Sequence, residues 1–406
     1  MKILVLNSGS SSQKTSLYDL APPLPANPPQ PLWEGKLDWR DGRASLEARN
    51  SHGATEAKDV AAAAPADAAA QLLDFLTMGQ TGVVQNKSEI SAVGHRIVNG
   101  GPDYTQPALI TPGVRSAIEK MAVFAPLHNK AGLEGIALIE KIFGSSVAQI
   151  AVFDTGFHSR LPQAAAVYPG PYEWFEQGIR RYGFHGINHR YVSERAAQLM
   201  GRDLAALKLV TCHLGNGCSL AAVREGRSID TTMGFTPLEG LMMGTRSGSV
   251  DPAILTYLMR EQHLSAGQID DLLNKQSGLL GISGLSSDMR RIVSAMEQGN
   301  ARAKLAFDIF VHRLQTGIGS MAAALAGLDA LVFTAGIGEN SSEVRAAACS
   351  HLAFLGLALD PHKNASPQGD ADISDRASPA RVFVIHAEED WSIARQCLQL
   401  LQPNAA

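Results

Sequence analysis

An apolar strand that ends at a small, glycine-containing turn occurs twice in this sequence, about half a chain apart. The first copy, residues 2–12, reads KILVLNSGSSS, and the second, residues 209–219, reads LVTCHLGNGCS. A second alternating segment follows each turn, at 16–20 and at 220–223, so each copy predicts a strand–turn–strand unit. A tight turn of this kind directs several backbone N–H groups at one spot, where they can hold a phosphate. Two such turns predict two similar lobes that close on one nucleotide.

Length and composition predict a globular protein of two domains. The chain has 406 residues, of which 45% are hydrophobic and 18% are charged, so a single ordinary core is too small for it. The formal net charge of −4 gives no basic footprint for nucleic acid or for an anionic membrane.

The cysteines and the apolar stretches indicate the cellular compartment in which the protein is expected. The four cysteines lack a paired CxxC spacing, which argues against a structural zinc site and a disulfide framework. The most apolar stretch, 321–333, is short and contains Asp329, and residues 1–7 lack the pattern of a secretory signal. We therefore expect a cytoplasmic protein without a membrane span.

Strands alternate with helices along the chain, which is typical of the α/β class. The long helix is expected to bury Leu305, Ile309, Leu314, Ile318 and Met321, and Asn340 with Glu343 is expected to cap the helix after 340. We predict strands at 90–96, 149–153, 207–213, 330–334 and 381–386, helices at 60–76, 111–124, 130–143, 251–263, 302–327 and after 390, and loops at 21–31, 126–129 and 364–380.

Two glycine-containing motifs resemble nucleotide loops only in part. Residues 9–15 read G-x4-K-T, but the second glycine of a P-loop is missing before Lys14 and a strand follows instead of a helix. Residues 336–341 read GIGENS, with Ser341 where a dinucleotide fingerprint needs its third glycine. An ordinary strand-to-helix turn explains the second motif equally well, unless its glycines let a flat or anionic ligand approach.

A histidine and two arginines are candidates for anion chemistry. His185 and His189 are four residues apart, but Gly186 stands where a zinc protease needs glutamate, so we interpret His189 as structural. His185 lies between glycines, where a core histidine is unusual. Arg96 ends a strand beside the paired glycines Gly100 and Gly101, and Arg246 lies among small residues, as expected for guanidinium groups that bind a carboxylate or phosphate through two hydrogen bonds.

Taken together, these motifs resemble the acetate kinase family, within the larger group of sugar kinases, actins and Hsp70-type ATPases. The motifs NSGSSSQK, GHRIVNGG, FDTGFH, YGFHG, CHLGNGCS, GFTPLEGLMMGTRSGSVDP and FTAGIGENS occur in this order over nearly the whole chain. The resemblance implies a two-domain, actin-like ATPase (ribonuclease H-like) fold of the α/β class, with duplicated mixed five-stranded sheets flanked by helices. It implies one domain of residues 1–155 with the C-terminal helix 390–406, a second domain of residues 156–389, and a homodimer.

The resemblance also implies a reaction and the residues that carry it. The reaction is the reversible, Mg²⁺-dependent transfer of a phosphoryl group from ATP to acetate, giving acetyl phosphate and ADP by direct in-line transfer, with Mn²⁺ as a substitute metal. The implied residues are Asn7 and Glu389 for the metal; Arg96, Asp154, His185 and Arg246 for catalysis; Arg96, Val98, Leu127, Phe184 and Pro237 for the acyl substrate; and Lys14, His213, Leu214, Gly215, Asn216, Gly217, Asp288, Met289, Arg290, Gly336, Ile337, Gly338, Glu339 and Asn340 for the nucleotide.

Several points stay open on the sequence alone. The family usually has Asn-Glu-Glu where this chain has Glu388-Glu389-Asp390, so any of the three acids can be the metal ligand. A propionate kinase would use the same chemistry, because one methylene in an apolar pocket is worth only ~1–3 kcal/mol. A non-catalytic nucleotide switch of actin or Hsp70 type and, on GIGENS alone, a nicotinamide dehydrogenase are the alternatives of other classes.

Overall fold

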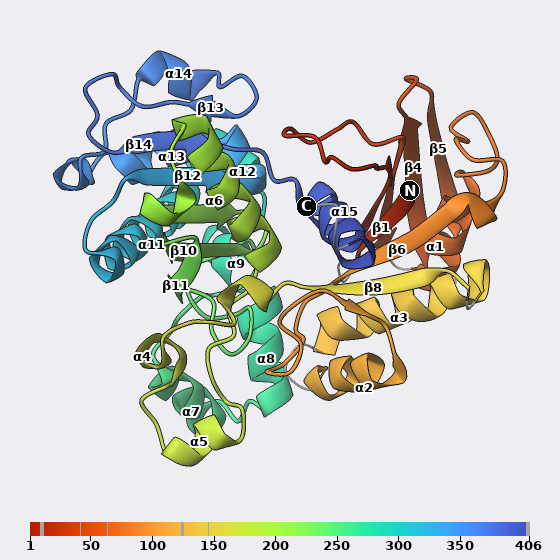
Figure 1. Cartoon of the computed structure of the whole chain (residues 1–406). Helices are drawn as coiled ribbons and strands as arrows, with labels where there is room; N and C mark the ends of the chain where they lie inside the picture. Colours follow the sequence, from red (N-terminus) through yellow and green to blue (C-terminus); the bar gives the residue numbers. More distant parts are fainter. Residues whose placement is uncertain (9–11, 41, 63, 123–125, 145, 403–406) are drawn as a thin grey trace. The chain divides into compact units, whose positions relative to one another are not determined.

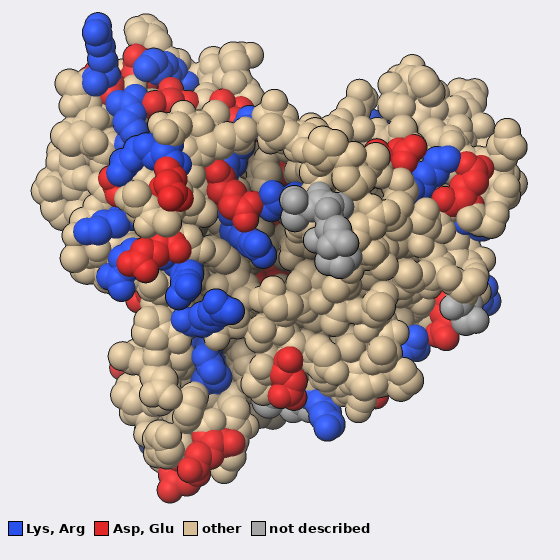
Figure 2. Space-filling model, in the orientation of Figure 1, with Lys and Arg blue, Asp and Glu red and all other residues tan. Residues whose placement is uncertain are grey.

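The chain divides into two compact units (Figure 1). The computed structural model describes residues 1–8, 12–40, 42–62, 64–122, 126–144 and 146–402. The first unit comprises residues 1–156 and 388–406, and the second comprises residues 157–387. Lys and Arg side chains are interspersed with Asp and Glu on the face shown in Figure 2, in keeping with the small net charge.

The sheet of the first unit has eight strands in the order β5-β4-β3-β2-β1-β6-β8-β7. Strands β1 to β5 form an antiparallel meander, whereas β1, β6 and β8 run parallel. The strands are β1 (Lys2–Ser8), β2 (Ser12–Asp19), β3 (Trp33–Arg40), β4 (Arg43–Asn50), β5 (Thr55–Ala61), β6 (Ile90–Ile97), β7 (Ala108–Leu109) and β8 (Ala148–Phe153).

The sheet of the second unit has six strands in the order β11-β10-β9-β12-β14-β13. They are β9 (Lys208–Leu214), β10 (Cys218–Arg224), β11 (Arg227–Thr231), β12 (Ala330–Thr334), β13 (Ala371–Asp372) and β14 (Arg381–Val384). Its first five strands repeat the arrangement β3-β2-β1-β6-β8 of the first unit, with three antiparallel strands and then two parallel ones. The duplicated mixed sheet implied by the resemblance is thus confirmed, and β4, β5, β7 and β13 are additions to the five-stranded pattern.

Alternation along the central strands of the first unit directs side chains to helices on both faces. The helices are α1 (Pro65–Asp74), α2 (Pro112–Met121), α3 (Pro126–Phe143) and α15 (Glu389–Leu401). Leu4 and Leu6 join a core cluster that includes Leu72 of α1 and Ile139 of α3. Helix α15 packs on β1 and β6. Its contact includes Gly94 of β6, which has no side chain to hold the helix away.

We predict that Gly94→Ala lowers the free energy of unfolding by about 1–3 kcal/mol, because core overpacking has this cost. A Cβ atom at this position would lie 2.7 Å from both Cys397 Sγ and Ile393 Cγ2 of α15. Urea unfolding followed by circular dichroism measures the change. Gly267→Ala in an exposed helix is the control: nothing lies within 4 Å of the added atom, so it should stabilise by up to about 1 kcal/mol. Equal effects of the two variants would contradict the packing argument.

Helices also cover both faces of the second sheet. His189 of α6 contacts Thr211 and Ser219, whereas Gly317 of α11 lies against Leu220 on the opposite face. The helices are α4 (Gln163–Ala166), α5 (Tyr172–Glu176), α6 (Gly186–Met200), α7 (Pro252–Glu261), α8 (Ala266–Lys275), α9 (Gly278–Ser283), α10 (Met289–Glu297), α11 (Ala301–Leu325), α12 (Ala335–Asn340), α13 (Ser342–Cys349) and α14 (Pro361–Ala365). Among the described residues, no helix is both long and apolar enough to cross a membrane.

Two predictions of local structure are wrong because tertiary packing decided them. Residues 126–129 begin α3 instead of forming a loop, with Pro126 at a helix start, where its missing N–H costs nothing. In α11, Leu305 is exposed, and the buried face includes Ala303, Ala306 and Phe310. Small alanines allow close packing there, so the larger residues alone did not mark the buried stripe.

Two further predictions fail at the C-terminal side of the second unit. Ser341, and not Asn340, caps α13 by accepting a hydrogen bond from the Val344 N–H. The predicted loop 364–380 contains strand β13 and two fully buried residues, Ile373 and Ser374. The Ser374 hydroxyl accepts from the Val382 N–H, which satisfies the buried backbone in a segment that reads as polar.

Candidate active site

Parallel strand ends bring the first group of candidate residues together in the first unit. Asn7, Arg96 and Asp154 lie at or just beyond the carboxyl ends of β1, β6 and β8, which are neighbours in the sheet. Ligands in open α/β sheets bind beyond these ends. Arg96 Nη2 donates to Asp154 Oδ2 at 2.6 Å, and Asp154 is fully buried. The carboxylate of Asp154 therefore holds Arg96 at the carboxyl ends of the parallel strands.

The acids at the start of α15 join the same group. Asn7 Nδ2 donates to Glu389 Oε2 at 3.0 Å and to Asp390 Oδ1 at 3.2 Å. Ser16 Oγ donates to Asp390 Oδ2 at 2.6 Å, and Arg96 Nε lies 3.9 Å from Glu389 Oε2. Burial, with the charge of Glu389, raises the pKa of Asp390 against the hydrogen bonds from Ser16 and Asn7. Sequence reasoning did not select Ser16, since a serine on a strand carries no signal of its own.

These residues fit a magnesium ion held partly by its substrate. Among the described residues, no group of three or more His, Cys, Asp or Glu side chains forms a metal site. Mg²⁺ commonly takes only one or two carboxylates from the protein, with phosphate oxygens and water completing the octahedron. Glu389 and Asn7 offer carboxylate and amide oxygens of the required hard type, and Asp390 lies beside them.

In the second unit, a glycine turn, a histidine and an arginine converge. Gly215 N donates to Gly217 O at 3.0 Å in the turn between β9 and β10. A Cβ atom added to Gly217 would lie 3.4 Å from His185 Nε2 and 3.6 Å from Arg246 Nη1. Arg246 Nη1 also donates to the Pro237 carbonyl at 3.0 Å. The histidine and the arginine predicted for catalysis in this unit thus meet at the second predicted phosphate turn.

His185 is held firmly at the start of α6. Its backbone is left-handed, with φ of 57°, which is uncommon for a residue other than glycine and often marks functional sites. Its ring stacks on that of His213, with centroids 3.9 Å apart and planes at 14°. His185 Nδ1 lies 2.8 Å from Ser219 Oγ. His189, interpreted as structural, is fully buried and contacts the same hydroxyl.

Buried histidines predict a loss of stability in mild acid. Burial lowers the pKa of His95 and of His158 from 6.5 to about 4. Between these values the unfolded chain binds protons that the folded chain does not, so the free energy of unfolding falls as pH falls. We expect ~2 kcal/mol per histidine between pH 7.5 and pH 5, measured by urea unfolding. His95→Gln should reduce the pH dependence, and a stability that is unchanged at pH 5 would contradict the prediction.

The predicted nucleotide segments are engaged in local structure. Residues 336–340 belong to helix α12 instead of forming a turn, and Ala335 before them has a φ of 64°. Glu339 accepts hydrogen bonds from Ala335 N and Ala387 N, and Asn340 Nδ2 donates to Gly336 O. Nothing lies within 4 Å of a Cβ added to Gly336, so the backbone is approachable there.

The second nucleotide segment is the start of α10. Asp288 caps this helix by accepting from the Arg290 N–H and forms an ion pair with the Arg290 side chain at 2.6 Å. Met289 between them is buried. The Asn216 carbonyl accepts from Gly244 N at 3.1 Å, which joins the turn between β9 and β10 to the loop that bears Arg246.

Arg345 is a buried group that sequence reasoning missed. Its guanidinium donates to the Gly338 and Glu339 carbonyls at 3.0 and 2.8 Å and to the Asn364 carbonyl at 2.6 Å. It thereby satisfies the carbonyls at the end of α12, which a short helix cannot pair itself.

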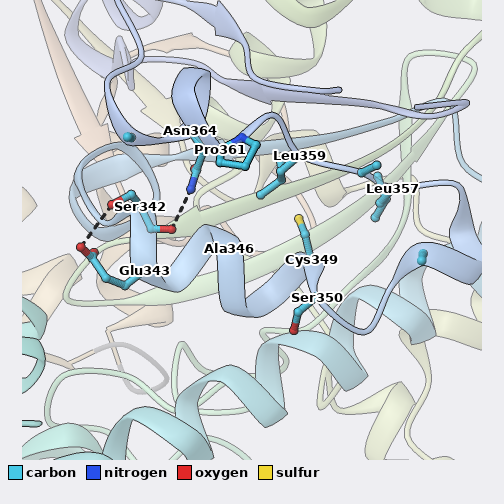
Figure 3. Close-up of a pocket in the computed structure, with 12 residues that line it drawn as sticks. Ser342, Glu343, Ala346, Cys349, Ser350, Leu357, Leu359, Pro361 and Asn364 are labelled. Carbon is cyan, nitrogen blue, oxygen red and sulfur yellow. Dashed lines mark hydrogen bonds between the residues drawn. The ribbon is translucent and has the colours of Figure 1, made fainter. Parts of the chain in front are cut away.

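A cavity of about 490 Å³ lies beside α13 and α14 (Figure 3). Its described lining contains none of the predicted site residues, so it is separate from the groups above.

The remaining predicted residues are dispersed or outside the description. Val98 and Phe184 are buried, in the first and the second unit respectively. Leu214 is fully buried at the end of β9, and Lys14 is paired in register with Asn7 across the first hairpin. The side chain of Leu127 and residues 9–11 of the first phosphate turn lie outside the described residues.

Comparisons with known proteins agree over the whole chain. The profile of the Acetokinase family matches residues 2–395. An acetate kinase of Gloeobacter violaceus is 59% identical over 405 residues, covering 99% of this chain and 100% of that protein. A crystal structure of Porphyromonas gingivalis acetate kinase has a TM-score of 0.89 at 39% identity, covering 98% and 99% of the two chains. A propionate kinase from Francisella tularensis has a TM-score of 0.88 at 40% identity, covering 97% and 98%. The chain therefore belongs to the acetokinase family.

Proposed function

We propose that the chain transfers the γ-phosphoryl group of ATP directly to the carboxylate of acetate, giving acetyl phosphate and ADP. ATP-dependent phosphorylation of acetate is the reaction of the acetokinase family, and it makes the chain a phosphotransferase with a carboxyl acceptor. The observation that carries the proposal is the convergence of His185 Nε2 and Arg246 Nη1 at Gly217 of the phosphate turn. A non-catalytic switch would have no use for these two side chains, and a dehydrogenase would not need them.

Phosphoryl transfer requires positioning and charge stabilisation more than covalent chemistry. Holding acceptor and phosphoryl group in line can supply ~7–11 kcal/mol of the barrier lowering. In this proposal His185 and Arg246 bind the phosphoryl oxygens as the group moves, and Arg96 binds the carboxylate of acetate. We propose that the two units are the two domains of the enzyme.

Acetate needs no general base, because its pKa is near 4 and it is already an anion at neutral pH. The ion pair of 2.6 Å between Asp154 and Arg96 supports a different role for this buried aspartate. We assign Asp154 to orienting Arg96. Asp154→Asn should then weaken acetate binding together with turnover, and turnover close to that of the unchanged protein would make Asp154 purely structural.

Magnesium fits the first unit's group of residues. Glu389 and Asn7 would hold it, with Asp390 adjacent, and Mn²⁺ would substitute for it. The ion would shield the triphosphate charge when bound. Removing divalent metal with EDTA is expected to abolish turnover, and restoring Mg²⁺ or Mn²⁺ should recover it.

Hydroxamate formation tests the function directly. Incubation of the protein with acetate, ATP, Mg²⁺ and hydroxylamine should yield acetohydroxamate. Hydrolysis of ATP with no acetohydroxamate formed would refute the proposal. The same assay on propionate and butyrate at matched concentrations decides the acyl preference. Propionate is the second candidate, because a propionate kinase is as similar in structure as an acetate kinase. We expect acetate to exceed propionate by about 10-fold or more in kcat/KM, since one methylene is worth ~1–3 kcal/mol.

We also propose that the enzyme is a homodimer. None of the described residues of α7 is buried, although Ile254, Tyr257 and Met259 are large apolar side chains with about half their surface exposed. Ile254 and Tyr257 lie one turn apart on one face of α7, and an exposed apolar patch of this kind is typical of an interaction surface. Light scattering should give about twice the chain mass of 43.1 kDa, and Tyr257→Glu should shift it towards the monomer. A monomeric unchanged protein at micromolar concentration would overturn this.

A further inference from the structure

A chain of buried side chains extends from His185 into the second sheet. Ser219 Oγ lies 2.8 Å from His185 Nδ1 and also 2.8 Å from His189 Nε2. His189 Nδ1 lies 2.7 Å from Thr211 Oγ1, which donates to the Ala221 carbonyl at 3.5 Å. Ser219, His189 and Thr211 are fully buried.

Counting protons leaves two possible directions of donation, or polarities, along this row of hydrogen bonds. The Ser219 hydroxyl has one hydrogen, so it donates to one imidazole and accepts from the other. Burial, with His158 and His213 contributing, holds the pKa of His189 well below its ordinary value, so His189 is neutral and has one N–H. Fixing any one hydrogen in the chain therefore fixes all the others.

Only one polarity uses every contact. In it, His185 Nδ1–H donates to Ser219, Ser219 donates to His189 Nε2, His189 Nδ1–H donates to Thr211, and Thr211 donates to Ala221. In the reverse polarity Thr211 turns its hydrogen to His189, and the 3.5 Å hydrogen bond from the Thr211 hydroxyl to the Ala221 carbonyl is lost. A doubly protonated His185 also requires the first polarity, because both its nitrogens then carry hydrogen.

We propose that Ser219 and His189 are positioning residues that fix His185 with Nδ1 protonated and Nε2 directed at the Gly217 turn. This rests on the proposed function, in which His185 Nε2 and Arg246 act on the moving phosphoryl group. The neutral acceptor at the end of the chain lets His185 take a second proton at Nε2 without breaking any bond at Nδ1. Partners that orient metal-ligating histidines are typically worth about 10–100-fold in activity, and we expect the same scale for the contact of Ser219 with His185.

Nitrogen NMR on the 406-residue protein measures the tautomer of His185 directly. The protein has 12 histidines, so ¹⁵N-histidine labelling gives a tractable spectrum. The variant His185→Gln identifies the signals of His185. We expect the neutral form of His185 to be protonated at Nδ1. Protonation at Nε2 with a bare Nδ1 would overturn the proposal. In Ser219→Ala the signal should shift towards the Nε2–H form, and an unchanged tautomer would also overturn it.

Kinetics provide the second readout. Ser219→Ala should lower kcat by about 10–100-fold with less than about threefold change in either KM. Ser219→Thr restores a hydroxyl and should recover kcat to within about threefold. Ser228→Ala is the matched control, because Ser228 Oγ lies 2.7 Å from His158 Nδ1 in another buried Ser–His contact outside the chain. An equal loss of kcat in Ser228→Ala would refute positioning through Ser219. Absence of acetate phosphorylation with the expected NMR tautomer would refute the proposed function and leave the hydrogen-bond chain intact.

Discussion

Arg246→Ala is expected to lower kcat by about 10³–10⁵-fold, the scale for an arginine at a phosphoryl-transfer transition state. The guanidinium lies with His185 at Gly217, and a moving phosphoryl group beside an acetate anion brings like charges together. Among the contacts described for that turn, none involves a second arginine that could replace Arg246. The hydroxamate assay, with kcat and both KM values determined separately, measures the loss.

The control for this variant is another arginine that donates to main-chain carbonyls. Arg302 donates to Ile282 O and Gly281 O in the same unit, and Arg302→Ala removes a comparable group away from the phosphate turn. We expect it to keep kcat within about tenfold. A folded Arg246→Ala protein that loses less than tenfold would contradict the role of Arg246 in stabilising the transition state.

Arg96→Ala is expected to lower both activity and stability. Its loss deprives the fully buried Asp154 of its cation at 2.6 Å, and breaking a buried ion pair from one side costs about 3–5 kcal/mol. The same loss removes the group that we assign to the acetate carboxylate, so kcat/KM for acetate should fall by about 10³-fold or more. Urea unfolding and initial-rate kinetics on the same preparation measure the two effects.

The double variant Arg96→Ala/Asp154→Asn separates these effects. Removing the aspartate charge should return much of the lost free energy of unfolding, because no uncompensated carboxylate remains buried. Activity should stay low, since no cation then meets the acetate carboxylate. Recovery of turnover in the double variant would show that Arg96 serves only to neutralise Asp154.

Features that depend on neighbouring residues were predictable from the sequence. Helices α2 and α7 begin where the sequence predicts them, with Thr111 and Asp251 as caps before Pro112 and Pro252, because a cap bonds to N–H groups two or three residues away. The repeated hairpin at 2–12 and 209–219 indicated the duplication that the two five-stranded arrangements confirm. Such signals need no knowledge of the rest of the chain.

Tertiary structure alone decided which groups support the site. Asn7 meets Glu389 across 382 positions, Ser16 meets Asp390 across 374, and Arg345 reaches from α13 to carbonyls of α12 and Asn364. In the sequence, a serine, an asparagine or an arginine that supports a site cannot be told from one that does not. Its role depends on which polar atoms the packed sheets and helices bring within hydrogen-bond distance, and burial then makes each such contact obligatory. The sequence by itself thus determined the family, the repeated sheet and the identities of the charged groups, while the packed core decided which of their atoms meet.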